Sequence, residues 1–274
     1  MLITDWTNNN GVTFDAPVFA IGDVHGQAQA LTRMLTHLET LPGATDGELI
    51  FLGDLIDRGP DTLGAVAAAF GARARWRAVT QLPGNHELML LAALEGHQDT
   101  RMLWLANGGM DVIEEIDTER KMTLDEATEA LRARLPADWV QTYAEGPTHL
   151  RRGRDGRALF IHAGIHPRRT LEETLAMPRR DRGDDHWAWI RQPFLGWPEG
   201  WAHLGLDLVI HGHTPATTQP LDDPREAAEL LDVVEAFGCI CLDAGAMRRP
   251  QVAAVEFRGD RHRLHIAEAP GTFL

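Results

Sequence analysis

The chain has 274 residues, and its 26 Lys and Arg against 40 Asp and Glu give a formal net charge of −14 at pH 7. Hydrophobic residues make up 44% and charged residues 24%, which is typical of a globular protein and excludes disorder, collagen and coiled coil. Because an acidic surface repels phosphate backbones, we expect no nucleic-acid partner. No run of about 18 apolar residues occurs, so we expect no membrane span.

The first third of the chain alternates short apolar runs with helical segments. The segment 27–38 has apolar residues three and four positions apart, which predicts a helix with one buried face, and Asp61 can cap another. The predicted strands are 18–21, 49–52 and 78–82, and the predicted helices are 27–38, 62–70 and 87–94. Three strand–loop–helix units predict a layered α/β fold.

The middle of the chain differs from the first third. From about residue 95 to 145 the pattern is helical and charged, and no Pro/Gly/Ser-rich linker separates it from its neighbours. We therefore predict a single domain over 1–274 with a helical insertion at about 95–145. Residues 166–205 are rich in loops and tryptophan. Further strands are predicted at 158–161, 208–210, 239–242, 252–257 and 264–266.

Two cysteines, Cys239 and Cys241, lie one residue apart. A disulfide between cysteines so close in sequence is strained, so we predict two reduced thiols in or beside a buried strand. Reduced thiols fit a reducing compartment. The first 11 residues lack the basic start and apolar core of a secretory signal, so we expect a cytoplasmic protein.

Five polar, glycine-flanked loops follow predicted strands. In an α/β sheet, the loops that leave the carboxyl ends of strands converge on one edge, so these five loops could meet at one place. They carry Asp, His and Asn, whose oxygen and imidazole donors suit manganese, iron or zinc. The loops are 22–26, 53–59, 84–87, 162–164 and 211–214.

Three of these loops carry motifs whose order and spacing are specific. They are Gly-Asp-x-His-Gly at 22–26, Gly-Asp-x-x-Asp-Arg-Gly at 53–59 and Gly-Asn-His-Glu at 84–87. The chain thereby resembles the metallophosphoesterases of the phosphoprotein phosphatase family, in particular the small bacterial and bacteriophage lambda type. The resemblance extends from about residue 18 to 245. It implies the calcineurin-like α/β fold, a two-layer β-sandwich core flanked by helices.

The resemblance also implies two divalent metal ions, manganese first, with iron or zinc as alternatives. Six side chains are implied as their ligands: Asp23, His25, Asp54, Asn85, His162 and His213. The first three hold one ion and the last four hold the other, so that Asp54 bridges the pair. The family pattern places a ligand histidine directly after glycine, which favours His213 over His211.

Four further roles follow from the resemblance. Arg58 and Arg191 grip the phosphate oxygens through paired guanidinium hydrogen bonds, and Asn85 also faces the substrate. His86 protonates the leaving oxygen, and Asp57 fixes the tautomer and orientation of His86. A hydroxide that bridges the metal ions attacks phosphorus directly, so that no covalent enzyme intermediate forms.

The expected function is a protein serine/threonine phosphatase, or one of dual specificity, with a phosphorylated protein or a small phosphoester as its partner. The alternative is a symmetrical diadenosine tetraphosphate hydrolase or another nucleotide phosphoesterase. Asp57, Arg58 and Glu87 in their loops favour the protein phosphatase. A catalytically silent binding module would have lost a ligand or the acid, and none is lost. No feature of the sequence indicates an oligomeric state.

Overall fold

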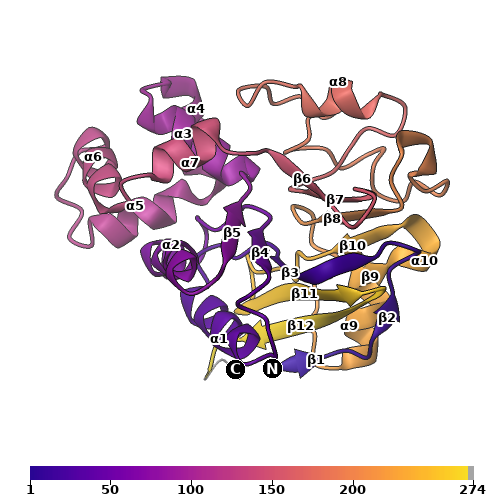
Figure 1. Cartoon of the computed structure of the whole chain (residues 1–274). Coiled ribbons are helices and arrows are strands. Elements are labelled where there is room, and N and C mark those ends of the chain that lie inside the picture. Colours follow the sequence, from indigo (N-terminus) through magenta and orange to yellow (C-terminus); the bar gives the residue numbers. More distant parts are fainter. Residues whose placement is uncertain (271–274) are drawn as a thin grey trace.

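Two β-sheets lie face to face in the computed structural model, which describes residues 1–270 (Figure 1). The first sheet contains β1 (Leu2–Ile3), β2 (Thr7–Asn8), β3 (Phe14–Ile21), β4 (Glu48–Phe51), β5 (Ala78–Gln81), β11 (Gln251–Gly259) and β12 (Arg261–Glu268). Its order is β1-β12-β11-β3-β4-β5, and β2 pairs with β12. Strands β3, β4 and β5 are parallel, whereas β11 runs antiparallel to β3 and β12.

The second sheet has the order β6-β7-β8-β10-β9. Its strands are β6 (His149–Arg152), β7 (Ala158–Ile161), β8 (Leu208–His211), β9 (Asp232–Val233) and β10 (Cys239–Cys241). The three central strands β7, β8 and β10 are parallel, and an antiparallel strand closes each edge. Each sheet therefore contains three adjacent parallel strands, whose ends can present loops to one common edge.

Most helices belong to two groups: one lies beside the first sheet, and the other is formed by the middle of the chain (Figure 1). The first group is α1 (Ala28–Glu39), α2 (Thr62–Gly71), η1 (Ala72–Ala74) and α3 (Asn85–Leu94). The middle group is α4 (Gln98–Trp104), the π-helical turn η2 (Leu105–Gly109), α5 (Met110–Ile116), α6 (Leu124–Arg134) and α7 (Trp139–Glu145). The later ones are α8 (Leu171–Leu175), η3 (Ala202–Leu204), α9 (Pro224–Leu231) and α10 (Val234–Phe237).

Alternation along the strands divides the hydrophobic core. On β3, Phe19 and Ile21 pack toward the helices, whereas Val18 and Ala20 belong to the core between the sheets. Successive side chains of a strand point to opposite faces, so a short apolar run feeds two cores. Such strands, buried on both faces, read as continuous hydrophobic runs, which is why the sequence identified them.

The outer face of the second sheet is covered by loops rather than by long helices. Leu159 and Ile161 of β7 pack there against Trp187, Phe194 and Trp201, all of which are buried. The tryptophan-rich segment 166–205 therefore supplies a third core. The predicted β-sandwich is confirmed, with the long helices beside the first sheet and mainly loops, together with the short helix α8, over the outer face of the second sheet.

The predicted strands and helices are present, and some short elements were not predicted. All eight predicted strands are found, as are the three helices of the first third, and residues 95–145 contain helices and no strand. Edge strand β6, with the sequence His-Leu-Arg-Arg, was not predicted because it lacks an apolar run. Both cysteines are free and buried, which confirms the prediction of reduced thiols.

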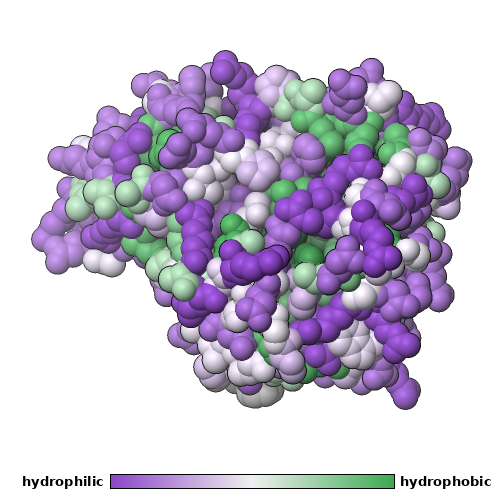
Figure 2. Space-filling model, viewed as in Figure 1, coloured by the Kyte–Doolittle hydropathy of each residue, from purple (hydrophilic) through white to green (hydrophobic). Residues whose placement is uncertain are grey.

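Within residues 1–270, none of the helices has the length and apolar character needed to cross a membrane. Hydrophilic residues dominate the face of the molecule drawn in Figure 2, and hydrophobic residues gather there in limited patches.

Candidate active site

The predicted ligands come from five loops that meet at one edge of the sandwich. Loops after β3, β4, β7 and β8 and the start of α3 carry them, as the convergence of parallel strand ends predicts. All six are buried, with at most 7% of any of them exposed: Asp23, His25, Asp54, Asn85, His162 and His213. The structure thus brings together residues that are up to 190 positions apart.

One cluster contains Asp54, His162 and His213, whose ligand atoms lie within 4.8 Å of one another. His162 Nε2 is 3.0 Å from Asn85 Oδ1 and 3.4 Å from Asp54 Oδ1. His213 Nδ1 lies 2.8 Å from the same Asn85 oxygen. The opposite nitrogen of His162 faces the Leu52 carbonyl at 3.0 Å, which orients the ring toward the cluster. These are the four side chains predicted to hold the second ion.

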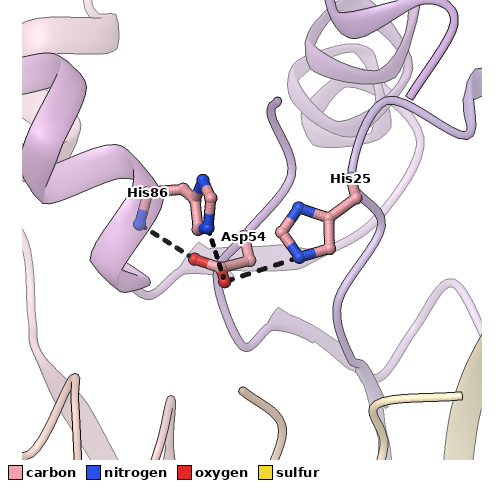
Figure 3. Close-up of side chains that lie close together, drawn as sticks. All are labelled: His25, Asp54 and His86. Atoms are coloured by element: carbon pink, nitrogen blue, oxygen red, sulfur yellow. Dashed lines mark hydrogen bonds and ion pairs between the residues drawn. The ribbon is translucent and has the colours of Figure 1, made fainter. Parts of the chain in front are cut away.

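A second cluster, drawn in Figure 3, contains His25, Asp54 and His86, whose ligand atoms also lie within 4.8 Å of one another. His25 Nε2 is 3.7 Å from Asp54 Oδ2 and 3.9 Å from Asp23 Oδ2, and its Nδ1 faces the Ile56 carbonyl at 3.0 Å. His86 Nε2 also approaches Asp54 Oδ2, at 3.9 Å. Asp54 therefore stands between both clusters, the place expected of a bridging carboxylate.

Backbone strain concentrates in these loops. Within residues 1–270, seven residues other than glycine have positive φ, and five of them are predicted site residues. Such conformations cost about 1–3 kcal/mol each and persist where the surrounding structure enforces them, which is common at functional sites. The five are His25, Asp54, Asp57, Arg58 and His213.

Two glycines allow the loops to approach one another closely. A Cβ atom on Gly84 would lie 2.1 Å from Asp54 Oδ1, and one on Gly212 would lie 2.0 Å from Asp23 Oδ1. Any other residue at either position would displace a carboxylate that is predicted to bind metal. These glycines are thus needed for the site as well as for the turn.

The protonation states of His25, His213 and Asp54 suit metal binding. By contrast, burial alone would lower the pKa of His162, but the charge of Asp54 raises it. Burial, with the neighbouring His86, lowers the pKa of His25 to about 3, and burial with His162 lowers the pKa of His213 well below its ordinary value. Burial alone would raise the pKa of Asp54, but the rings of His162, His86 and His25 hold it well below its ordinary value. Neutral imidazoles and an ionised carboxylate are the forms that bind divalent metals.

The predicted acid and its orienting carboxylate form a hydrogen-bonded pair. His86 Nδ1 is 2.6 Å from Asp57 Oδ2, and both side chains are buried. Trp104 Nε1 donates to the same carboxylate, at 2.9 Å from Oδ1. Burial lowers the pKa of His86 to about 4 and raises that of Asp57 well above its ordinary value.

The two predicted phosphate-binding arginines differ in how they are held. Arg58 Nε donates to the Asn107 carbonyl at 3.0 Å, and its Nη1 lies 3.4 Å from Met247 Sδ. The Arg191 side chain is exposed, and its charge contributes to the lowered pKa of His213. Within the described part of the chain, no hydrogen bond or ion pair fixes the Arg191 guanidinium.

The sequence reasoning missed the structural role of Glu87. Its buried carboxylate accepts hydrogen bonds from the backbone N–H groups of Asp54, Leu55 and Gly84, at 2.7, 2.9 and 2.9 Å. It thus joins the second and third polar loops. Its place in the Gly-Asn-His-Glu motif was the available signal, but the motif alone does not show which groups Glu87 contacts.

Asp243 is a further buried carboxylate at the site. It accepts a hydrogen bond from the Gly245 N–H at 2.9 Å. Burial, with the nearby charge of Asp54, raises the pKa of Asp243 to about 6. Burial together with Asp243 and Asp54 likewise raises the pKa of Asp23 well above its ordinary value.

Comparison with characterised proteins gives two groups of relatives. The chain is 38% identical over 128 residues to "Serine/threonine-protein phosphatase 1" of Salmonella typhimurium, covering 45% of this chain and 51% of that one. It is 31% identical over 160 residues to "Bis(5'-nucleosyl)-tetraphosphatase, symmetrical" of Bordetella pertussis, covering 58% and 48%. The chain thus spans about half the length of the curated relatives it matches.

Solved structures with much lower sequence identity share the fold. A protein serine/threonine phosphatase from Saccharomyces cerevisiae superposes with a TM-score of 0.58 at 12% identity, covering 93% of this chain and 80% of that one. A cold-active protein-tyrosine phosphatase from a Shewanella species gives 0.55 at 17% identity, covering 94% and 81%. At such identities the likeness concerns the fold alone.

A family profile covers most of the chain. The profile described as "Calcineurin-like phosphoesterase" matches residues 16–217, a range that includes all six predicted metal ligands. It confirms the resemblance that the motifs of the polar loops indicated. The chain therefore belongs to the calcineurin-like phosphoesterase family.

Proposed function

We propose that the chain is a metal-dependent phosphomonoester hydrolase that acts on phosphorylated serine and threonine side chains of proteins, with or without activity on phosphotyrosine. The observation that carries this proposal is the buried pair of His86 and Asp57, 2.6 Å apart, beside Asp54. Such a pair provides a positioned general acid, which a phosphomonoester with a poor leaving group requires.

The donor set fits two divalent cations, manganese first. Imidazole nitrogens, carboxylate oxygens and one amide oxygen converge on both sides of Asp54, and this mixture suits manganese, iron or zinc. Two such ions, when bound, would neutralise charge on the phosphoryl oxygens and supply an activated water for direct transfer. The residues proposed to hold them are Asp23, His25, Asp54, Asn85, His162 and His213.

The remaining residues bind the substrate and move one proton. Arg58 and Arg191 present guanidinium groups to the phosphate, and Asn85, itself a proposed metal ligand, also faces the substrate. The Nδ1 of His86 is engaged by Asp57, so its Nε2 is the atom that delivers the proton to the leaving oxygen. Arg58 is held by the Asn107 carbonyl, which limits the reorganisation needed when phosphate binds.

A second candidate is symmetrical cleavage of diadenosine tetraphosphate. The match to the Bordetella pertussis tetraphosphatase extends over 160 residues, against 128 for the Salmonella typhimurium phosphatase. This longer match supports the second candidate. The same residues would then act on a phosphoanhydride, whose leaving group is a nucleotide phosphate. Such a leaving group is a weaker base than an alkoxide and depends less on the proton from His86.

The two candidates are separated by a panel of kcat/KM values, measured with defined metals, for phosphoserine, phosphothreonine and phosphotyrosine peptides and diadenosine tetraphosphate. We expect higher values for phosphoserine or phosphothreonine peptides, and activity in manganese. Higher values for the dinucleotide would replace the first candidate with the second. If the chain hydrolyses neither the phosphopeptides nor the dinucleotide nor an aryl phosphate, both candidate functions are wrong.

A further inference from the structure

The π-helical turn η2 and the end of α4 contact the second polar loop at three points. The Trp104 indole N–H donates to both oxygens of the Asp57 carboxylate, at 2.9 and 3.1 Å. The Asn107 carbonyl accepts from Arg58 Nε at 3.0 Å, and the Gly108 carbonyl accepts from the Arg58 backbone N–H at 3.4 Å. The helical segment in the middle of the chain thus contacts Asp57 and Arg58, two of the three charged residues of this loop.

The local backbone is shaped for this approach. Gly108 has φ of 117°, and a Cβ atom there would lie 2.5 Å from Arg58 Cγ. A Cβ atom on Gly109 would lie 2.4 Å from the Trp104 ring. A single π-helical turn within a helical segment frequently marks a functional position, and this turn leaves room for the indole and the guanidinium together.

Trp104 does not reach the substrate itself. Its side chain is fully buried, and it lies behind Asp57, on the far side from Asp54 in the hydrogen-bonded series Trp104–Asp57–His86. An indole N–H can only donate, so it fixes the carboxylate without competing for its proton-accepting role toward His86. The carboxylate therefore has one fixed donor on each side.

We propose that Trp104 is a positioning residue for the general acid: its N–H holds the Asp57 carboxylate in the orientation that aims His86 at the leaving oxygen. This inference rests on the proposed function only for its kinetic consequence. The geometric consequence, that Trp104 fixes the hydrogen bond between Asp57 and His86, can be tested without any turnover.

The chain offers a matched control in Trp139. This tryptophan is also fully buried and lies in the same hydrophobic core, and among residues 1–270 its indole nitrogen has no hydrogen-bond partner. Trp104→Phe and Trp139→Phe both remove one indole from this core. Only Trp104→Phe removes a hydrogen bond to the acid's partner, so the difference between them isolates that bond.

The kinetic test compares p-nitrophenyl phosphate, whose leaving group needs little protonation, with phenyl phosphate, whose leaving group needs more. We expect Trp104→Phe to lower kcat on phenyl phosphate by about 10-fold and on p-nitrophenyl phosphate by no more than about 2-fold, the scale for losing a residue that orients a catalytic group. KM should stay unchanged. Trp139→Phe should leave the ratio of the kcat values for the two substrates at the wild-type value. An equal loss on both substrates, or the same pattern in Trp139→Phe, would overturn the proposal.

A spectroscopic test does not depend on activity. The proton between His86 Nδ1 and Asp57 should give a low-field NMR resonance that His86→Gln removes. We expect Trp104→Phe to shift or broaden this resonance and Trp139→Phe to leave it unchanged. An unchanged resonance in Trp104→Phe would contradict the proposal. This result would hold even if the wild-type chain hydrolyses no phosphoester. Should Trp104→Phe fail to fold, 3-benzothienylalanine at position 104 removes the N–H while keeping the ring shape, and the same outcomes apply.

Discussion

The molecule buries carboxylates at two places that differ in how their charge is balanced. On the outer face of β11, Glu256 is fully buried and contacts Arg263 Nε at 2.7 Å, His265 Nε2 at 3.1 Å and the Arg258 guanidinium. Burial would raise the pKa of Glu256, but hydrogen bonds from His265, Arg258 and Arg263 lower it to about 2. None of these residues has positive φ.

At the strand-end edge the balance is different. Five buried carboxylates gather there, and within residues 1–270 the guanidinium of Arg58 is the cation in closest reach of them. Burial and mutual repulsion raise the pKa of Asp23 rather than lowering it. The carboxylates are Asp23, Asp54, Asp57, Glu87 and Asp243.

We interpret this difference as that between an ion cluster that stabilises the fold and a cluster that we propose binds metal ions. The Glu256 cluster neutralises itself, so it stabilises the fold without an external partner. The strand-end cluster has an excess of acid on a strained backbone, which is the arrangement expected where divalent cations complete the charge balance. The predictions below test this distinction, from the largest effect to the smallest.

Removing the shared carboxylate should have the largest effect. Asp54→Asn weakens a ligand to both proposed ions, each of which supplies several kcal/mol of transition-state stabilisation, so kcat/KM should fall by about 10⁴-fold or more. Activity on p-nitrophenyl phosphate measures the loss. The exposed Asp222→Asn serves as the control and should keep wild-type activity; equal effects of the two changes would contradict the bridging role.

Removing the proposed acid should have a smaller and more selective effect. His86→Ala should slow hydrolysis of a poor leaving group by about 10²–10⁴-fold, the scale of general acid catalysis, while the metal content stays at the wild-type value. His97→Ala, at an exposed position, is the control. Because His86 Nε2 lies 3.9 Å from Asp54 Oδ2, loss of one ion in His86→Ala would identify His86 as a ligand instead.

The structural cluster should respond in stability rather than in activity. Glu256→Gln leaves two arginines unpaired and should lower the free energy of unfolding by about 3 kcal/mol at pH 7, as breaking a buried ion pair does. Urea unfolding measures this change, with the exposed Glu229→Gln as control. Activity per folded molecule should stay at the wild-type value, and a loss of metal binding would contradict the assignment.

The same cluster predicts a pH dependence with a definite sign. The pKa of Glu256 is about 2 in the folded chain against 4.5 for an ordinary Glu, so its contribution to stability is complete above about pH 4.5. It is lost as the pH falls from there through about 2. The difference in unfolding free energy between wild type and Glu256→Gln should therefore shrink in that range; a constant difference would contradict the ionic origin.

The smallest effect is expected at Asp23, and its sign should be opposite. With metal removed, the ionised carboxylate of Asp23 is repelled by Asp54 and Asp243. The amide of an asparagine would avoid this repulsion and keep one oxygen to accept the hydrogen bond from the His213 N–H, which is 3.0 Å from Asp23 Oδ1 in the wild type. Asp23→Asn should thus stabilise the metal-free chain by up to about 1 kcal/mol. Urea unfolding in a chelator measures this; a destabilisation like that of Glu256→Gln would erase the distinction between the clusters.

The sequence defined the strand ends better than the surroundings of the site. The apolar runs before Gly22, Gly53 and Pro83 located the parallel strands, and the convergence of their loops followed from topology. By contrast, the contact of Trp104 with Asp57 spans 47 residues. A contact of that length depends on how the helical segment packs, which local periodicity does not encode.

The cluster around Glu256 was missed for a related reason. In the predicted strand 252–257 this residue is a lone acid among apolar neighbours. Its partners are residues of β11 and β12, which the register of the hairpin brings beside it. Glu256 pairs with Arg263 across the ladder, a relation that only the register reveals. Side chains that pair across strands are thus harder to predict than ligands that share a loop motif.

The central claim is that Asp54 lies between two cations held by strand-end side chains. Equilibrium dialysis of the wild-type chain and Asp54→Asn against manganese, with the bound metal counted per chain, tests this most directly. We predict two tightly bound ions in the wild type and fewer than one in Asp54→Asn. A single ion in the wild type, or two equally tight ions in both proteins, would contradict the account.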